Sequence, residues 1–157
     1  MNKIVDLHMH VVPIIDDGSR SIKESLQMLQ LAADQGITDV FCTSHNGYCI
    51  EDGKRYLTSF LRLQEAVIEE KINVRIHKGC EILCACNYID DIIYGLDIGA
   101  FSTLGNSKYV LIELYPDAKP SEALTIVKTL TANGYKPIIA HMDRNYNITS
   151  LMVRLMI

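Results

Sequence analysis

Short apolar runs alternate with longer amphipathic stretches along this chain. The apolar runs predict strands at residues 3–8, 38–43, 74–79, 109–114 and 136–140. The amphipathic stretches predict helices at residues 21–36, 54–71, 87–94, 120–133 and 150–156. Unbroken apolar segments such as Val110-Leu111-Ile112 are typical of strands that are covered on both faces. Strands separated by helices of this length therefore predict βαβ units and a parallel sheet.

Two of the helices carry more specific signals. Ser21 followed by Glu24 is a capping-box pattern, which predicts the start of the first helix. In the second helix, four apolar side chains are expected to face the core: Leu57, Leu61, Leu63 and Val67.

Histidine and acidic residues follow the predicted strands. They are His8, His10, His45, Glu81, Glu113 and His141. The C-terminal ends of the strands in a parallel α/β barrel converge on one rim, so these side chains are expected to meet in space. His8 and His10 are two residues apart and point to the same side of a strand, where two imidazoles can bind one metal ion.

A single histidine in such a place is more often an ordinary core or surface residue. Here, however, four of the five histidines follow predicted strands, together with two acidic residues in apolar surroundings. A carboxylate in such surroundings is costly unless it is paired or binds a metal. The combination therefore favours a metal site.

Composition narrows the class of protein. The chain has 157 residues, 48% of them hydrophobic and 22% charged, which predicts one globular domain over residues 1–157. A net charge of -4 without a basic stretch argues against a nucleic-acid partner. The sequence has no apolar run of membrane-spanning length and no signal-peptide core, so we expect a cytoplasmic protein. Three cysteines lie close together (Cys80, Cys84 and Cys86), but no second pair completes a zinc site, and we expect buried thiols.

Six motifs, in chain order, resemble the PHP (polymerase and histidinol phosphatase) superfamily. They are Asp6-Leu7-His8-Met9-His10, Asp16-Asp17-Gly18-Ser19, Thr43-Ser44-His45, Gly79-Cys80-Glu81-Ile82, Ile112-Glu113-Leu114 and Ile139-Ala140-His141-Met142-Asp143-Arg144. Within that superfamily, residues 4–155 resemble the manganese-dependent protein-tyrosine phosphatases of bacterial capsule and exopolysaccharide operons. The resemblance implies a PHP-type distorted (β/α) barrel related to the TIM barrel. It also implies a hydrolase whose substrate is a phosphotyrosine protein, a bacterial tyrosine kinase that controls polysaccharide export.

The resemblance also implies a ligand set for two to three metal ions. His8, His10 and Glu81 would hold the first ion, and Glu81 would bridge to a second ion held by Glu113 and His141. Asp17 and His45 would hold the third. Mn²⁺ is the expected metal, although such ligands also suit Fe and Zn. The ions would clamp the phosphate oxygens and activate water for in-line attack on phosphorus.

Five residues in or near the motifs have expected roles. Arg144 and Asp17 are expected to act in catalysis, Arg144 by binding phosphate through its guanidinium group. The alternative for Arg144 is a surface salt bridge. Asp6 could orient an imidazole, whereas Asp16 either orders its loop or binds nothing. His77 matches no ligand position and is expected to be structural.

The chain departs from the resembling family after His141. The family ends with a further strand that carries an Asp-x-His pair, which this sequence lacks. A closed barrel takes about 250 residues, so five or six strands and an incomplete barrel are expected here. Its open strand edge and apolar flank would favour association. A shortened gene product, one piece of a larger enzyme, and a homo-oligomer whose second copy covers the flank are the three explanations.

Two other functions compete with the phosphatase. One is a catalytically weak PHP domain that binds a phosphorylated partner or serves as an association module. The other is a cysteine phosphatase, because Cys49 and Arg55 have the Cys-x5-Arg spacing. The intervening Glu51 and Asp52 argue against this, since they would repel phosphate and raise the thiol pKa.

Overall fold

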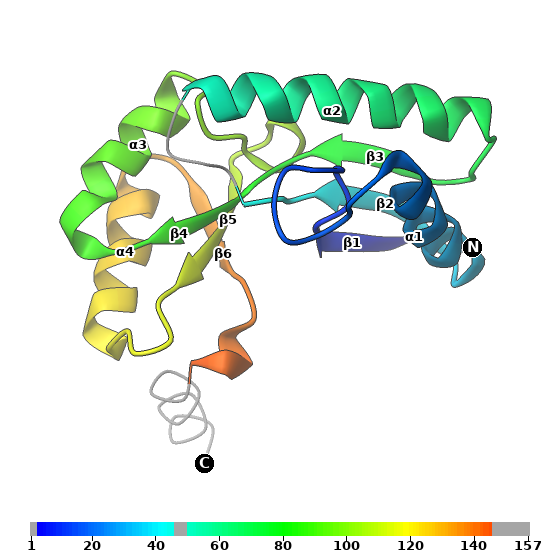
Figure 1. Cartoon of the computed structure of the whole chain (residues 1–157). Helices are drawn as coiled ribbons and strands as arrows, with labels where there is room; N and C mark the ends of the chain where they lie inside the picture. Colours follow the sequence, from blue (N-terminus) through cyan, green and yellow to red (C-terminus); the bar gives the residue numbers. More distant parts are fainter. Residues whose placement is uncertain (1–2, 46–49, 146–157) are drawn as a thin grey trace, which may run out of the picture.

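The two parallel sheets of this protein each contain three strands (Figure 1). The structure is a computed structural model that describes residues 3–45 and 50–145. The first sheet has the order β1 (Ile4–Met9), β2 (Ile37–Cys42) and β3 (Arg75–Lys78). The second has the order β4 (Glu81–Cys84), β5 (Tyr109–Leu114) and β6 (Lys136–Ile139). An isolated parallel bridge between His45 and Glu81 connects them.

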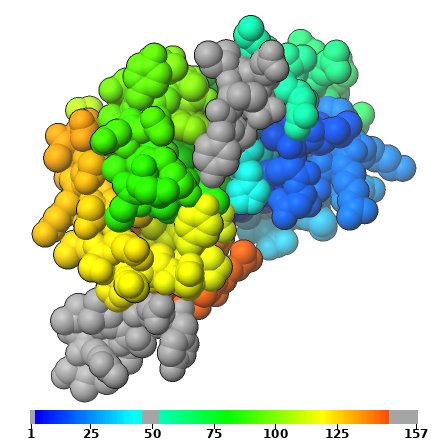
Figure 2. All heavy atoms as spheres, turned by 60° about the vertical axis from the view of Figure 1, so that its left-hand side comes forward, coloured from blue at the N-terminus to red at the C-terminus, as the bar shows by residue number. Residues whose placement is uncertain are grey.

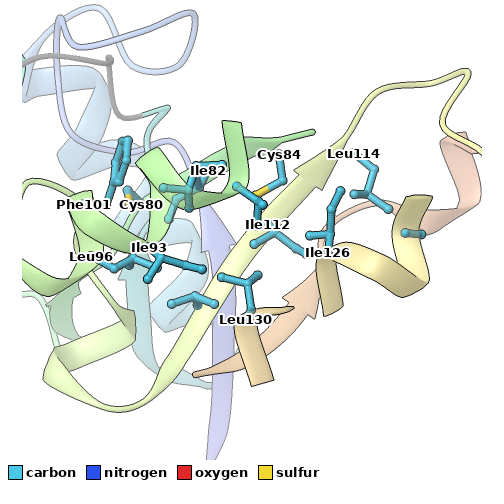
Figure 3. Packing of buried hydrophobic residues seen from close by; sticks show 14 residues of the cluster. Cys80, Ile82, Cys84, Ile93, Leu96, Phe101, Ile112, Leu114, Ile126 and Leu130 are labelled. Atoms are coloured by element: carbon cyan, nitrogen blue, oxygen red, sulfur yellow. The ribbon is translucent and has the colours of Figure 1, made fainter. Parts of the chain in front are cut away.

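Each sheet packs against two helices. Helices α1 (Ile22–Asp34) and α2 (Ile50–Glu69) cover the first sheet, with Leu29 and Leu63 fully buried between the layers. Helices α3 (Ile89–Asp97) and α4 (Pro120–Ala132) cover the second sheet, where Ile112 and Leu130 belong to the core shown in Figure 3. Short 3-10 helices lie at Cys86–Tyr88, Leu104–Asn106 and Met142–Arg144.

The two layered halves adjoin one another. Figure 2 shows the blue N-terminal residues on the right and the yellow residues of the second half on the left. A small apolar cluster connects them, in which Phe41 of β2 packs with Leu104, Leu111 and Ala140. The sheets of the described chain do not close into a barrel, because β1 and β6 are outer strands. Ile4, Val5 and Leu7 of β1 are 50%, 45% and 40% exposed, so the expected open edge and apolar flank are confirmed.

The third predicted strand is confirmed as β3, but a further strand after it was not predicted. Residues 74–79 were expected to form one strand that ends before Glu81, but the chain forms two strands, β3 and β4, in different sheets. Gly79 lies at the break, where an added Cβ would approach Leu104 and Thr43 side-chain atoms to 3.0 Å. The chain therefore passes from one sheet to the other at a closely packed point, and Glu81 begins a strand.

The inward face of α2 also differs from the prediction. Leu57 and Leu61 are 43% and 47% exposed. The four residues expected to face the core mix two helix faces, because Leu57 and Leu61 are not on the same stripe as Leu63 and Val67. The buried stripe follows the i, i+4, i+7, i+11 spacing of one face. Its members are Tyr56, Phe60, Leu63 and Val67.

The cap of α1 is close to the predicted one. The Ser21 hydroxyl accepts a hydrogen bond from the Glu24 amide at 3.1 Å, as expected of an N-cap. The Glu24 carboxylate accepts from the Arg20 amide at 2.7 Å. The second bond of the predicted capping box is thus displaced by one residue.

Cys80 and Cys84 are buried, as predicted, but Cys86 is exposed. Burial raises the pKa of the Cys84 thiol to about 12. Cys49 and the predicted helix at residues 150–156 lie outside the described residues, while the Arg55 guanidinium donates to the Ile15 carbonyl at 3.0 Å. No helix within the described residues is long and apolar enough to cross a membrane.

Candidate metal site

The carboxylate of Glu81 lies at the centre of a group of histidines. Its side chain is 1% exposed, and its Oε2 atom lies 3.0 Å from His10 Nε2 and 3.1 Å from His8 Nε2. Its Oε1 atom lies 2.7 Å from His141 Nε2. His45 Nδ1 is 3.4 Å from Oε2. Four predicted histidine ligands therefore surround Glu81, and the expected convergence is found in the structure.

Most of these side chains are at the C-terminal ends of strands. His8 is on β1, His45 and His141 follow β2 and β6, and Glu113 is the second-last residue of β5. Glu81 is the exception, because it is the first residue of β4. It reaches the group because its amide donates to the Ser44 carbonyl, which places the start of β4 beside the end of β2.

A cavity of about 470 Å³ opens over this group. Its lining contains all seven predicted metal ligands, together with Gly18 and Arg144: His8, His10, Asp17, Gly18, His45, Glu81, Glu113, His141 and Arg144. The residues expected from the sequence to bind metal and phosphate thus line one cavity.

The spacing of the donor atoms suits a metal ion. His8 Nε2 and His10 Nε2 are 3.1 Å apart, and both approach the same Glu81 oxygen to within 3.1 Å. Donor atoms that lie about 2.1 Å from one octahedral ion are about 3.0 Å from each other. Two imidazole nitrogens and a carboxylate are also a ligand set that suits Mn, Fe or Zn. The residues present therefore fit a divalent ion.

The charges around the cavity also favour a cation. Burial lowers the pKa of His10, but its hydrogen bonds to Asp16 and Glu81 outweigh burial and raise the pKa to about 10. Burial raises the pKa of Glu81, but its hydrogen bonds to His10 and His8 outweigh burial and hold the pKa well below its usual range. Without a metal, positive charge on His10 stabilises the buried carboxylate. A divalent ion would supply that charge instead.

The ligand groups differ in one point from the expected ones. Within the described residues, three groups have donor atoms within 4.8 Å of one another: His8, His10 and Glu81; His10, Asp17 and His45; and His45, Glu81 and Glu113. The first was expected, and the second contains the expected pair of Asp17 and His45. In the third, His45 takes the place expected for His141. His141 Nε2 still lies 3.6 Å from Glu113 Oε1.

The remaining predicted residues lie in different surroundings. Arg144 is exposed at the edge of the cavity, and within the described chain no carboxylate is close enough to form an ion pair with it. His77 lies outside the cavity and contacts Asp39 at 2.8 Å. Asp6 accepts a hydrogen bond from the backbone amide of His8 at 2.9 Å and not from an imidazole ring. The expected role of Asp6 in orienting an imidazole is therefore not seen.

The carboxylate of Asp16 contacts an imidazole instead. Its Oδ2 atom lies 2.8 Å from His10 Nδ1 and also accepts from the backbone amide of His45 at 2.8 Å. Its Oδ1 atom accepts from the backbone amide of Gly18 at 3.0 Å. Burial raises the pKa of Asp16, but the hydrogen bond to His10 and those from the two amides lower it overall. The only sign of this contact in the sequence is that Asp16 is adjacent to Asp17.

The backbone at His141 is also unusual. Its φ angle of 28° is positive, which is uncommon for a residue with a side chain. Such strained conformations often occur at functional sites, where the surrounding structure holds them. Here the conformation turns the chain after β6 so that the imidazole faces Glu81.

A parallel α/β fold with imidazoles and carboxylates gathered at the strand ends defines a class of protein with a candidate metal site. Comparison with known proteins specifies the family. Residues 4–156 match the family described as "Capsular polysaccharide synthesis, CpsB/CapC". The chain belongs to this family.

Three similar relatives are described as tyrosine-protein phosphatases. The chain is 32% identical over 149 residues to the putative tyrosine-protein phosphatase CapC of Staphylococcus aureus, which covers 90% of this chain and 55% of the relative. It is 30% identical to YwqE of Bacillus subtilis (strain 168), with 92% and 56% covered, and 29% identical to CpsB of Streptococcus pneumoniae, with 90% and 57% covered. The chain thus spans a little more than half the length of these relatives.

A solved structure gives the same picture of the fold. It comes from crystal structures of YwqE from Bacillus subtilis and CpsB from Streptococcus pneumoniae, described as unique metal-dependent tyrosine phosphatases. The match has a TM-score of 0.80 at 28% identity and covers 98% of this chain and 62% of that chain. The expected PHP-type α/β fold, present in part, is therefore confirmed.

Proposed function

We propose that this protein is a metal-dependent phosphomonoesterase that acts on phosphotyrosine in a protein, in the cytoplasm. The observation that supports this most directly is the single cavity lined by His8, His10, Glu81, Glu113 and Arg144. Its donor atoms fit divalent ions, and Mn²⁺ is the metal we expect. The relatives of the same family are named tyrosine-protein phosphatases, which supports the choice of substrate. Regulation of capsular or exopolysaccharide synthesis through a bacterial tyrosine kinase is the role that follows.

The side chains divide the work of such a reaction. Divalent ions, when bound here, would polarise phosphoryl oxygens and lower the pKa of coordinated water. Arg144, at the cavity edge, is free of ion pairs with described residues and can grip two phosphate oxygens through its planar guanidinium. Asp17 is 84% exposed and faces the cavity mouth, where it can bind an ion or receive a proton. Glu81, with His8 and His10, would hold one such ion.

The test is release of phosphate from a phosphotyrosine peptide by the full chain in Mn²⁺. We expect stimulation by Mn²⁺, loss on chelation, and loss in His10→Ala and Glu113→Ala. His77→Gln is the matched control, because His77 lies outside the cavity. It should retain the wild-type rate. The absence of phosphate release with every divalent metal tried would refute the proposal, as would equal losses in His77→Gln and His10→Ala.

A second function has one observation in its favour. The described strands form two open sheets, and the chain spans about 55–57% of its relatives. A catalytically weak domain that binds a phosphorylated partner or associates with another chain would fit that arrangement. Counting bound ions per chain by mass spectrometry separates the two, because a non-catalytic module needs fewer than two ions.

A further inference from the structure

The Asp16 carboxylate contacts three separate segments that meet at the candidate metal site. It lies beside the imidazole of His10, which follows β1. It accepts from the amide of Gly18 in its own loop, and from the amide of His45, which follows β2. The side chain is 5% exposed, so these contacts take place largely out of water. One carboxylate thus fixes all three segments that carry His10, Asp17 and His45.

The contact with His10 decides which ring nitrogen is available to a metal. An ionised carboxylate can only accept, so the bond at 2.8 Å requires the proton to be on His10 Nδ1. The tautomer of a ligating histidine is set by the partner of its other nitrogen. His10 can then offer only Nε2, which lies 3.1 Å from His8 Nε2 and 3.0 Å from Glu81 Oε2. His10 is thereby assigned to the group that contains His8 and Glu81.

The two amide contacts hold the neighbouring ligands. The turn that Asp16 closes with Gly18 contains Asp17, so it sets the direction in which that exposed carboxylate points. The hydrogen bond from the His45 amide to Asp16 fixes the backbone of His45, whose side chain is 43% exposed. Asp17 and His45 have little packing of their own, and their positions depend on these backbone contacts.

We infer that Asp16 is a positioning residue that selects Nε2 of His10 as a metal ligand and holds Asp17 and His45 in place for an adjacent ion. This inference rests on the metal-dependent function proposed above. Asp16 itself does not bind the ion, because both oxygens of its carboxylate already accept hydrogen bonds.

Two variants separate positioning from general stability. In Asp16→Ala, the methyl group reaches neither His10 nor the amides of Gly18 and His45, so all three contacts are lost. In Asp16→Ser, the shorter hydroxyl can still accept from Gly18 but does not reach His10 or His45. Asp39→Asn is the matched control, because Asp39 is also a buried carboxylate, accepts from Arg75 and His77, and lies outside the cavity.

The readouts are Mn²⁺ affinity by calorimetry and the melting temperature of the metal-free chain. We expect both Asp16 variants to lose about 10–100-fold in affinity, as is usual when a partner of a ligating histidine is removed. Asp39→Asn should melt earlier yet keep its affinity within about twofold. In the Zn²⁺-loaded wild type, proton NMR should show a protected Nδ1–H of His10 that is absent in Asp16→Ser.

The outcomes are distinct. Wild-type affinity in both Asp16 variants, or an equal loss in Asp39→Asn, overturns the inference and leaves the proposed function standing. A wild-type chain that binds Mn²⁺ with the expected dependence on Asp16 but releases no phosphate overturns the function alone. A wild-type chain that binds no divalent ion overturns both.

Discussion

Replacing Gly18 by alanine tests how tightly the loop that carries Asp17 is held against the end of β1. A Cβ atom at Gly18 would lie 2.2 Å from the carbonyl oxygen of His10 and 2.5 Å from its Cβ. Carbon atoms pack best at about 3.5–4.0 Å. Both obstacles belong to the backbone or its first side-chain atom, so neither can rotate away. The loop must therefore withdraw from β1.

The cost of that withdrawal follows from the contacts it breaks. The Ser19 amide donates to the His10 carbonyl at 3.1 Å, across the gap that the new methyl group would occupy. Overfilling a packed site costs about 1–3 kcal/mol, and a lost hydrogen bond adds about 1 kcal/mol. We expect Gly18→Ala to lower the free energy of unfolding by about 2–4 kcal/mol. It should also weaken Mn²⁺ binding, because Asp17 moves with the loop.

Urea unfolding followed by circular dichroism measures the change, with the free energy extrapolated linearly to water. Gly53→Ala is the control. Within the described part of the chain, a Cβ at Gly53 would meet the Ala100 carbonyl at 3.7 Å and nothing nearer, and alanine favours a helix by about 1 kcal/mol over glycine. The control should be neutral or stabilising. A loss below about 0.5 kcal/mol in Gly18→Ala would show that the loop relaxes freely and would refute the reasoning.

Three other predictions concern parts of the fold away from the loop. Leu130→Ala removes a fully buried side chain between α4 and the second sheet, and should cost about 2–5 kcal/mol in urea unfolding. The Arg75 guanidinium, aided by His77, holds the pKa of Asp39 well below its usual range. The stability that the ionised Asp39 contributes to the fold is therefore complete above the unfolded pKa of about 3.9 and is lost as the pH falls through the folded pKa. Calorimetry should show that Asp39→Asn melts earlier than the wild type at pH 7, and that this difference shrinks in acid. Burial and the hydrogen bond to Asp97 raise the pKa of Tyr135 to about 12. That stabilisation is present below about pH 10 and is lost as the pH rises through the folded pKa. Tyr135→Phe should therefore remove a component that titrates near pH 12 from the ultraviolet absorbance.

The gathering of the site residues within each sheet could be predicted because it depends only on strand direction. Each apolar run marks a strand, and a parallel sheet brings the C-terminal ends of its strands to one edge. His45 and His141 directly follow such runs, so their neighbourhood was set once the strands were parallel. That reasoning covers each sheet by itself, whereas the meeting of the two groups also depends on the contact between Glu81 and Ser44 where the sheets adjoin.

The change of sheet at Gly79 could not be predicted in this way. Residues 81–84 form a short run that begins with a charged residue, and nothing in its pattern separates it from a loop after β3. Only the tertiary pairing makes it a strand, because β4 pairs with β5 while β3 pairs with β2. The contact of Asp16 with His10 was hidden for a similar reason. Two adjacent carboxylates are equivalent in sequence, and the amide of His45 selects one of them only after folding.

The position of the candidate site at the junction of the sheets gives its charges a second consequence. His8, His10 and His45 come from the first sheet, whereas Glu81, Glu113 and His141 come from the second. The small cluster around Leu111 is an apolar contact between the halves. An ion bound by both sets would tie the two sheets together, since a ligand that binds only the folded arrangement stabilises it by mass action. The residues that suit the chemistry are thus also those that would hold the two halves in register, so metal binding and sheet docking should strengthen one another.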